Sequence, residues 1–392
     1  MLKNYKCSPA QIVLLLMCVF VVRPYYVQIF SAANDIWAYL TLLFAAASCV
    51  LAFVYRKEKE IGLVLIFAII YIIATLLNES HNILSVVSTV CQIVLGFNIG
   101  VLAFSGECVD KKVDVIRFVT TIYLYLYIIC GFLDVSVRFF GQYDTITFFG
   151  YDNYAAFIVL PLMAIKWSLD SYQTGCVLKR DWLCWGLCLL YNLKLRSFTI
   201  IAVLCLFVVV YLFVRYFREI RKIIKPWVAF VLIVLFLVGI VRFQMQYLAA
   251  GILEALGKGV TLNSRTWIWD RTITAIFQRP ILGQGYLSEG SFQWLINIDP
   301  ADHPAASHGH NIILDILICT GFVGLICFGI LLFQQVRAAR KHLANKEIYL
   351  LLTGLFLFLL LGTFDGYPFI ATFYLMISLL GSIPRYDKKE EV

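Results

Sequence analysis

Charged residues are scarce in this chain: they make up 14% of its 392 residues. A soluble globular protein carries about 25% charged residues, so this scarcity excludes an ordinary water-soluble domain. Hydrophobic residues make up 61% of the sequence, and the mean hydropathy is +0.86. The sequence also has no internal repeat and no low-complexity tract, which excludes repeat architectures. The composition therefore predicts an all-α polytopic membrane protein.

The sequence contains many long runs of apolar residues. A membrane-spanning helix needs roughly 17–25 predominantly apolar residues. About twelve runs fit, although the seventh is short, and we expect one transmembrane domain over 1–392. The N-terminal run resembles a signal peptide, but no small-residue cleavage site closes it, so we count it as the first span. The predicted spans are 9–29, 36–55, 61–77, 83–104, 115–133, 153–170, 182–195, 197–214, 227–247, 311–334, 347–363 and 366–384.

Lysines and arginines are sorted between the two sides of the membrane. If the N-terminus lies inside, 23 of the 32 fall in inside segments and 9 in outside segments. The positive-inside rule then predicts that both termini are cytoplasmic. The net charge of +8 is therefore mostly a topology signal, and the scattered basic loops do not favour a nucleic-acid-binding face. The outside residues are Arg23, Arg138, Lys194, Arg196, Arg242, Lys258, Arg265, Arg271 and Arg279.

Cysteine is absent from the three largest outside loops, 134–152, 248–309 and 364–366. The twelve cysteines lie in spans or inside loops, so we expect free thiols. Cys184 and Cys188 are one helical turn apart, but no histidine accompanies them. Packing is therefore the favoured role for this pair, and a metal site is not expected there.

The segment 248–309 is the only sizeable piece outside the spans, and the charge count places it on the outer face. Asn263 or Ser264 can cap a helix that starts near Arg265, and Pro280 ends it. The spacing of the apolar residues predicts an amphipathic helix in the outer interface. Its apolar face consists of Trp269, Ile273, Ile276 and Phe277, and Gly283 and Gly285 then allow a tight turn.

Two outer arginines suggest an anion site. Arg196 lies in "YNLKLRSFTI", which joins two spans with almost no loop, and an arginine so close to hydrocarbon is costly without a partner. Arg265 lies beside the free N–H groups of a helix N-terminus, which favour anions. Together they favour a phosphate or diphosphate, to which arginine donates bidentate hydrogen bonds. The alternative is that both side chains reach the lipid headgroups.

His310 stands at the outer start of the span 311–334. On a straight helix Gly321 lies about 20° and Gly324 about 40° from its face. Glycines let a neighbouring helix approach closely, so we expect His310 to be held by a tightly packed helix at the outer water boundary. A neutral histidine there can act as a general base. The alternative is that His310 only caps the span.

Other polar residues give weaker signals. Asn311 can cap the span or bind an acceptor or sugar, and His308 can bind an acceptor or be a plain loop residue. Asp152 and Asn153 in "FFGYDNYAAF" can bind sugar hydroxyls or cap a helix. Asp365 in "GTFDGYPF" lies in a tight outer loop, where a turn role is favoured.

Two stretches, "NSRTWIWDRTITAIFQRPILGQGY" and "HGHNIILDILICTGFVG", together resemble the core of the O-antigen ligase and polymerase family of bacterial membrane glycosyltransferases. The shared pattern is an Arg- and Trp-bearing amphipathic segment, a Pro-x-x-Gly-x-Gly turn, and His-Asn followed after nine residues by Gly-x-x-Gly. "LRSFTI" resembles the family's short Arg-bearing start of a span before the large outer loop. The resemblance covers about 190–385, and the first 150 residues fit only as generic spans.

The resemblance implies a GT-C-type helical fold and metal-independent transfer, without a cofactor, of a glycan from a polyprenyl diphosphate carrier with inversion. The reaction would take place on the outer face of the bacterial cytoplasmic (inner) membrane. Arg196 and Arg265 would hold the diphosphate, and His310 would deprotonate the acceptor hydroxyl. The implied partners are a polyprenyl diphosphate-linked oligosaccharide, a glycan or lipid acceptor, membrane lipids, a flippase and a chain-length regulator.

Three functions remain open. Leu325 and Ile326 follow the Gly-x-x-Gly where some ligases have threonines, and the outer loop is modest. We therefore expect a polymerase that joins carrier-linked repeat units into surface polysaccharide, as in capsule, O-antigen or lipopolysaccharide. The alternative is ligase-type transfer of a finished glycan to a terminal acceptor. A transporter or flippase is least favoured, because the charged residues cluster near the ends of the spans.

Overall fold

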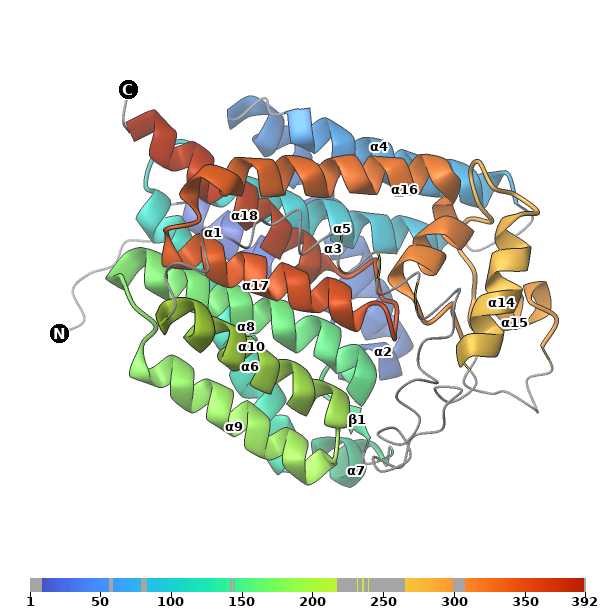
Figure 1. Ribbon diagram of the computed structural model, residues 1–392, viewed down its shortest axis with the longest axis horizontal. Helices are drawn as coiled ribbons and strands as arrows, with labels where there is room; N and C mark the ends of the chain where they lie inside the picture. The colour runs from blue at the N-terminus through green and yellow to red at the C-terminus, as the bar shows by residue number, and fades with distance from the viewer. Residues whose placement is uncertain are drawn as a thin grey trace.

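The computed structural model describes residues 9–55, 59–78, 83–141, 143, 145–216, 231, 235, 239, 265–298 and 307–390. These residues are almost entirely helical (Figure 1). The helices before residue 217 are α1 (Pro9–Val19), α2 (Tyr25–Ile29), α3 (Ser31–Tyr55), α4 (Lys59–Leu76), α5 (Ile83–Ala103), α6 (Val109–Phe132), α7 (Val135–Phe140), α8 (Asp152–Thr174), α9 (Lys179–Leu195) and α10 (Phe198–Tyr216).

The second half of the chain supplies five more labelled helices and one turn of 3-10 helix in the described residues. They are α14 (Arg265–Ile276), α15 (Glu289–Leu295), α16 (Ile312–Ala339), η2 (Arg340–His342), α17 (Lys346–Leu361) and α18 (Ala371–Glu390). The described strands, β1 (Ile146–Thr147) and β2 (Gly150–Tyr151), form one antiparallel pair in which Ile146 lies opposite Tyr151. The expected all-α architecture is thus confirmed.

Five described helices are long and apolar enough to cross a membrane: Ser31–Val54, Ile83–Ala103, Val109–Phe132, Asp152–Thr174 and Ile312–His342. Two shorter apolar helices, Ile61–Leu76 and Phe198–Phe213, follow the same pattern. These findings agree with a multi-pass membrane protein. The predicted span 227–247 and the first part of the loop 248–309 lie outside the described residues, apart from 231, 235 and 239. The total of twelve spans therefore stays a prediction.

The first predicted span, 9–29, is wrong as a single helix. α1 ends at Val19, and the chain turns before α2 begins at Tyr25. Pro24 immediately precedes α2 with a φ of −60° and a ψ of 143°. Proline has no N–H to donate within a helix, and its ring disfavours a helical conformation of the residue before it, which favours a break at this position.

The long helices lie side by side along one direction, and α14 and α15 gather at one end of the bundle (Figure 1). Helices α8 and α17 run antiparallel, because Phe157 stacks edge-on against Phe358 and Ser168 donates to the carbonyl of Glu347. Helices α5 and α18 run parallel, because Gly96 lies against Ala371 and Phe104, just after α5, meets Tyr386. The start of α16, the end of α17 and the start of α18 consequently share one end of the bundle with α14.

A buried ion-pair cluster ties α6, α8 and α9 together at the opposite end. Lys166 pairs with Asp170 at 2.8 Å and also with Asp181, and the side chains of all three are at most 1% exposed. Arg180 and Arg117 pair with the same Asp170 at 2.6 Å and 3.3 Å. Buried charges persist only when they are paired, so this cluster fixes the relative positions of three helices.

Helix α16 is broken at Gly321, which has a φ of 64° and a ψ of −168°. Only glycine adopts this conformation readily. Two assumptions of the sequence analysis are therefore wrong: α16 begins at Ile312, so His310 precedes the helix, and the helix does not continue straight through Gly321. Gly324 lies across the break, where a Cβ would meet the Thr320 hydroxyl at 2.0 Å.

The turn at 280–285 fills the break in α16. Gln284 and Gly285 donate their N–H groups to the carbonyls of Ile318 and Cys319, at 2.6 Å and 2.9 Å. Beyond the break, Phe322 and Val323 donate back to the carbonyls of Pro280 and Ile281, at 2.8 Å and 3.2 Å. Backbone polar groups inside a membrane protein must find partners within the protein. The Pro-x-x-Gly-x-Gly turn supplies them, and it fixes the first turns of α16 against α14.

Candidate active site

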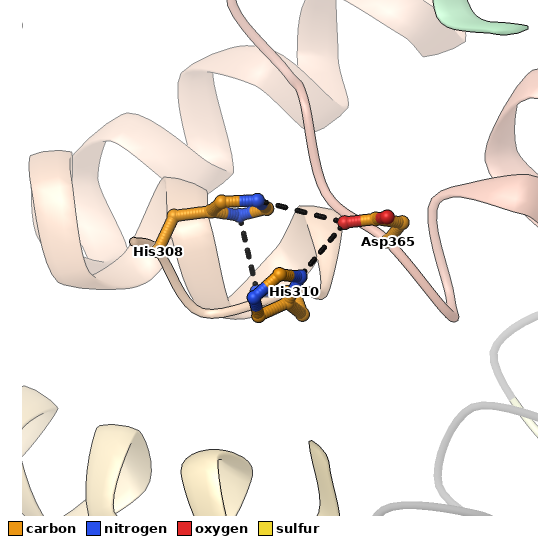
Figure 2. Close-up of side chains that lie close together, drawn as sticks. All are labelled: His308, His310 and Asp365. Atoms are coloured by element: carbon orange, nitrogen blue, oxygen red, sulfur yellow. Dashed lines mark hydrogen bonds and ion pairs between the residues drawn. The ribbon is translucent and has the colours of Figure 1, made fainter. Parts of the chain in front are cut away.

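His310 lies just before α16, in the left-handed backbone region with a φ of 47°. The residue is 8% exposed, and the indole N–H of Trp269 in α14 donates to its carbonyl at 3.3 Å. Its Nδ1 lies 2.9 Å from Oδ1 of Asp365, in the loop between α17 and α18 (Figure 2). The histidine is thus held by groups from two separate elements.

Asp365 is the residue that connects the cluster, and the sequence analysis underrated it. A turn role was favoured, but its side chain is 5% exposed and faces His310 on one oxygen and Arg265 on the other. Burial alone raises the pKa of this carboxyl, but the hydrogen bond from His310 and the positive charge of Arg265 lower the pKa below its ordinary value. An acidic residue beside a membrane span is the signal that could have identified it.

Arg265 opens the described part of α14 and points toward the same loop. It donates through Nη1 to the carbonyl of Phe364 at 2.5 Å and through Nη2 to Oδ2 of Asp365 at 3.1 Å. Its side chain is 21% exposed. Because a guanidinium carries five N–H donors, these two contacts leave donors for an anion. The predicted capping residues Asn263 and Ser264 lie outside the described residues.

His308 stands beside His310, with the two ring centroids 4.1 Å apart. Its Nδ1 lies 3.1 Å from Oδ2 of Asp315 in α16, and its Nε2 lies 3.5 Å from Oδ1 of Asp365. Burial lowers the pKa of His308, whereas the negative charges of Asp315 and Asp365 raise it more, so the net pKa is above the ordinary value. His308 therefore belongs to the cluster and is more than a plain loop residue.

Asn311 caps α16. Its Oδ1 accepts from the N–H groups of Ile313 and Leu314 at 3.1 Å and 3.3 Å, and its Nδ2 donates to the carbonyl of Thr363 at 3.1 Å. The residue is fully buried. These contacts make Asn311 the link between the start of α16 and the loop that carries Asp365, and they favour capping over contact with a sugar.

Three side chains of this cluster have the spacing of a possible metal site. Among the described residues, the donor atoms of His308, His310 and Asp365 lie within 4.8 Å of one another. Arg265 already places a positive charge on Asp365, and the two histidines also lie against that carboxylate (Figure 2). The hydrogen bonds here run from His310 to Asp365 and from His308 to Asp315, whereas the buried Nε2 of His308 has no hydrogen-bond partner among the described residues.

Arg196 lies elsewhere at the same end of the bundle. It ends α9 in the left-handed region, with a φ of 57°, and lines a cavity of about 330 Å³ with Lys194 and Asp134. Lys194 pairs with Asp134 at 2.6 Å. Among the described residues, no contact joins Arg196 to Arg265 or His310. The structure therefore brings Arg265 to the histidine but does not bring Arg196 there.

Asp152 and Asn153 begin α8 and contact each other, with the Asn153 N–H donating to Asp152 at 2.8 Å. They reach the cluster only through the next residue, Tyr154, whose ring packs edge-on against Tyr367 with centroids 4.9 Å apart. Tyr367 in turn packs against His308 at 4.6 Å. The two polar residues thus lie in the surroundings of the site and make no contact with it among the described residues.

The fold and the site together define a multi-pass helical membrane protein with a buried His–Asp pair at one end of its bundle. The profile of the family described as O-Antigen ligase matches residues 183–329. That segment contains Arg196, Arg265, His310 and the broken helix. The predicted resemblance is thus confirmed over residues 183–329, which match the O-antigen ligase family.

Two curated proteins are similar to parts of this chain. The Exopolysaccharide production protein ExoQ of Rhizobium meliloti is 29% identical over 121 residues, which is 28% of this chain and 27% of that protein. The ComP-specific O-oligosaccharyltransferase of Acinetobacter baylyi is 29% identical over 122 residues, 29% of this chain and 21% of that protein. The similarity thus spans only about a quarter of either relative's length.

Proposed function

We propose that this protein is a ligase-type glycosyltransferase, which moves a glycan from a polyprenyl diphosphate carrier to a terminal acceptor. The family description and the name of the Acinetobacter relative both favour this transfer over the polymerisation that the sequence first suggested. The observation that carries the proposal is the buried His310–Asp365 pair, with Arg265 on the second carboxylate oxygen. We assign the activity to the region 190–385.

His310 acts as the general base. Asp365 accepts a hydrogen bond from Nδ1–H of His310, which leaves the basic lone pair on Nε2. That nitrogen takes the proton of the acceptor hydroxyl while the oxygen attacks the anomeric carbon. The bond between this carbon and the phosphate oxygen breaks from the opposite face, so the configuration inverts. Asp365 stabilises the imidazolium that forms, as a carboxylate does in other His–Asp pairs.

The leaving diphosphate carries the charge that the arginines neutralise. Arg265 lies next to the base through Asp365 and keeps donors for an anion. Arg196 is the second proposed contact: it is exposed on a separate cavity beside Lys194, so it would bind the charged headgroup of the donor at a place away from the base. Because the charge is neutralised by arginines, we propose that the transfer needs no metal ion and no cofactor.

We place the reaction on the outer face of the bacterial cytoplasmic membrane, with both termini inside. The arrangement of helices supports this orientation. Arg117, Arg180 and other basic residues assigned to the inside lie at the end of the bundle opposite His310. A carrier lipid with its glycan outside then reaches the site from the membrane. The expected partners are a flippase, which supplies the glycan, and a chain-length regulator, which sets its length.

Product size tests the proposal. Purified protein in lipid nanodiscs receives a polyprenyl diphosphate-linked oligosaccharide, with and without a lipid or glycan acceptor. We expect single transfer that depends on the acceptor and is lost in His310→Ala. His342→Ala is the matched control, because His342 lies in η2 at the opposite end, and it should retain full transfer. A ladder of repeat multiples without acceptor would instead establish a polymerase.

A further inference from the structure

His308 has both ring nitrogens turned toward carboxylates. Nδ1 lies 3.1 Å from Asp315 Oδ2, and Nε2 lies 3.5 Å from Asp365 Oδ1. A neutral imidazole has only one N–H, so one of its nitrogens would direct a lone pair at a carboxylate oxygen. The doubly protonated ring donates from Nδ1 to Asp315, and its positive charge faces Asp365 at ion-pair distance, although Nε2 makes no hydrogen bond there.

The charges around His308 lead to the same conclusion. Two carboxylates face it, Asp315 from α16 and Asp365 from the loop before α18, whereas Arg265 from α14 is the one other cation in contact with either carboxylate among the described residues. Among the described residues, the rings of His310 and Tyr367 also pack against His308, with centroids 4.1 Å and 4.6 Å away. Buried charges are stable when paired, so a second cation is needed at His308.

We propose that His308 is a positioning residue: as an imidazolium it bridges Asp315 and Asp365, and it thereby holds the carboxylate and the ring of the catalytic pair. The proposal rests on the transfer mechanism above, because the bridged Asp365 is the partner of His310. Asp315 in turn accepts from the Gly309 N–H at 2.7 Å, so the bridge also fixes the chain just before His310.

Loss of the proton changes the contact that His308 makes with the catalytic residue. The backbone N–H of His310 points at Nδ1 of His308, at 3.1 Å, and this contact forms a hydrogen bond only when Nδ1 has a lone pair. A neutral ring with its proton on Nε2 gives up Asp315 and binds the backbone of His310, whereas a neutral ring with its proton on Nδ1 keeps Asp315 but loses the positive charge that faces Asp365. The two protonation states of His308 thus hold the general base in two different ways.

Transfer should consequently fall at alkaline pH as His308 loses its proton. The pKa of His308 is raised, so this loss comes above its ordinary value of about 6.5. A misplaced base lowers kcat by about tenfold to a hundredfold, whereas the donor KM stays unchanged. In His308→Asn, whose amide can still donate to Asp315, transfer is reduced and the alkaline fall disappears. A purely structural role would give a loss that is the same at every pH.

Protonation can be measured without any substrate. The full chain, with its five histidines, is labelled with ¹⁵N at the imidazoles and studied in nanodiscs by NMR over pH. We expect one ring to lose its proton only at a pH above the ordinary histidine pKa of about 6.5. This signal is absent in His308→Asn, and in Asp315→Asn the same ring loses its proton at lower pH. A neutral His308 at about pH 6.5 would overturn the bridge.

Stability gives a second readout that is independent of activity. A histidine whose folded pKa is raised stabilises the fold below its unfolded pKa of about 6.5, and this contribution is lost as the pH rises through the folded pKa. The difference in unfolding temperature between wild type and His308→Asn should therefore shrink at alkaline pH.

If glycan transfer fails but the NMR and stability results hold, only the proposed function is wrong. If the imidazolium is found but the alkaline fall persists in His308→Asn, the positioning role is refuted.

Discussion

Gly321→Ala should destabilise the protein severely, because the break in α16 depends on this glycine. At a φ of 64° and a ψ of −168°, an alanine costs about 1–3 kcal/mol in backbone strain. Its Cβ would also lie 2.2 Å from the carbonyl oxygen of Ile281 and 2.6 Å from the nitrogen of Leu282. Both are backbone atoms, which cannot rotate away as a flexible side chain can. The turn at 280–285 must therefore move out of the break.

Moving the turn breaks four backbone hydrogen bonds that join it to Ile318, Cys319, Phe322 and Val323. At about 0.5–1.5 kcal/mol each, their loss costs about 2–6 kcal/mol. With the strain included, we expect a total of about 3–9 kcal/mol, compared with a whole stability of about 5–15 kcal/mol for a typical protein. The site is also affected, because α14 and the first turns of α16 are no longer held together.

Gly329→Ala is the matched control on the same helix. Nothing lies within 4 Å of a Cβ at this position, so the change should be neutral or should stabilise the helix by up to about 1 kcal/mol. Both variants are unfolded in mixed micelles with increasing SDS, and tryptophan fluorescence gives the free energy of unfolding. If Gly321→Ala unfolds within about 1 kcal/mol of Gly329→Ala, the break is not held by the turn in the way described.

Three further predictions concern the chemistry. Asp365→Asn should lower the rate of transfer by about 10²- to 10⁴-fold with little change in donor KM, because the amide no longer sets the tautomer of His310 or stabilises its imidazolium. Single-turnover kinetics measure this rate, and a normal rate would remove Asp365 from the mechanism. Arg265→Lys and Arg196→Lys should each raise the donor KM, since lysine cannot donate in a bidentate manner; unchanged binding of a carrier diphosphate by both variants would exclude the arginine site. EDTA should leave transfer unchanged, and activity that disappears with EDTA and returns with a divalent cation would place a metal at the histidines.

The parts of the site that lie close in sequence were predictable. A helix over Arg265–Ile276, the left-handed backbone at Gly283 and Gly285 and the position of His310 just before α16 agree with the local patterns. The expectation of free thiols is confirmed for the eleven cysteines in the described part of the chain. Periodicity and turn residues are local signals, and they are reliable where one element determines the conformation.

The parts that depend on tertiary contacts were not predictable. In a long apolar run, the sequence pattern predicts that Gly321 is a helix-packing residue. The turn that breaks the helix lies about 40 residues earlier in the chain, so a local pattern does not reveal it. The local sequence predicts that Asp365 is a turn residue. Its partners, His310 and Arg265, are 55 and 100 residues away along the chain, so their contacts could not be predicted. Arg196 and Arg265 both read as anion ligands, but only the folded chain shows that Arg265 lies at the histidine and that Arg196 lines a separate cavity.

Asp365, the partner of the proposed general base His310, lies outside the segment that matches the family. The O-antigen ligase profile ends at residue 329, whereas Asp365 lies in the loop between α17 and α18. A chimera that takes only 183–329 from one relative would therefore combine one protein's histidine with another protein's carboxylate. Exchange of specificity between relatives should succeed only when the loop 362–370 is transferred as well, so that base and carboxylate come from the same parent.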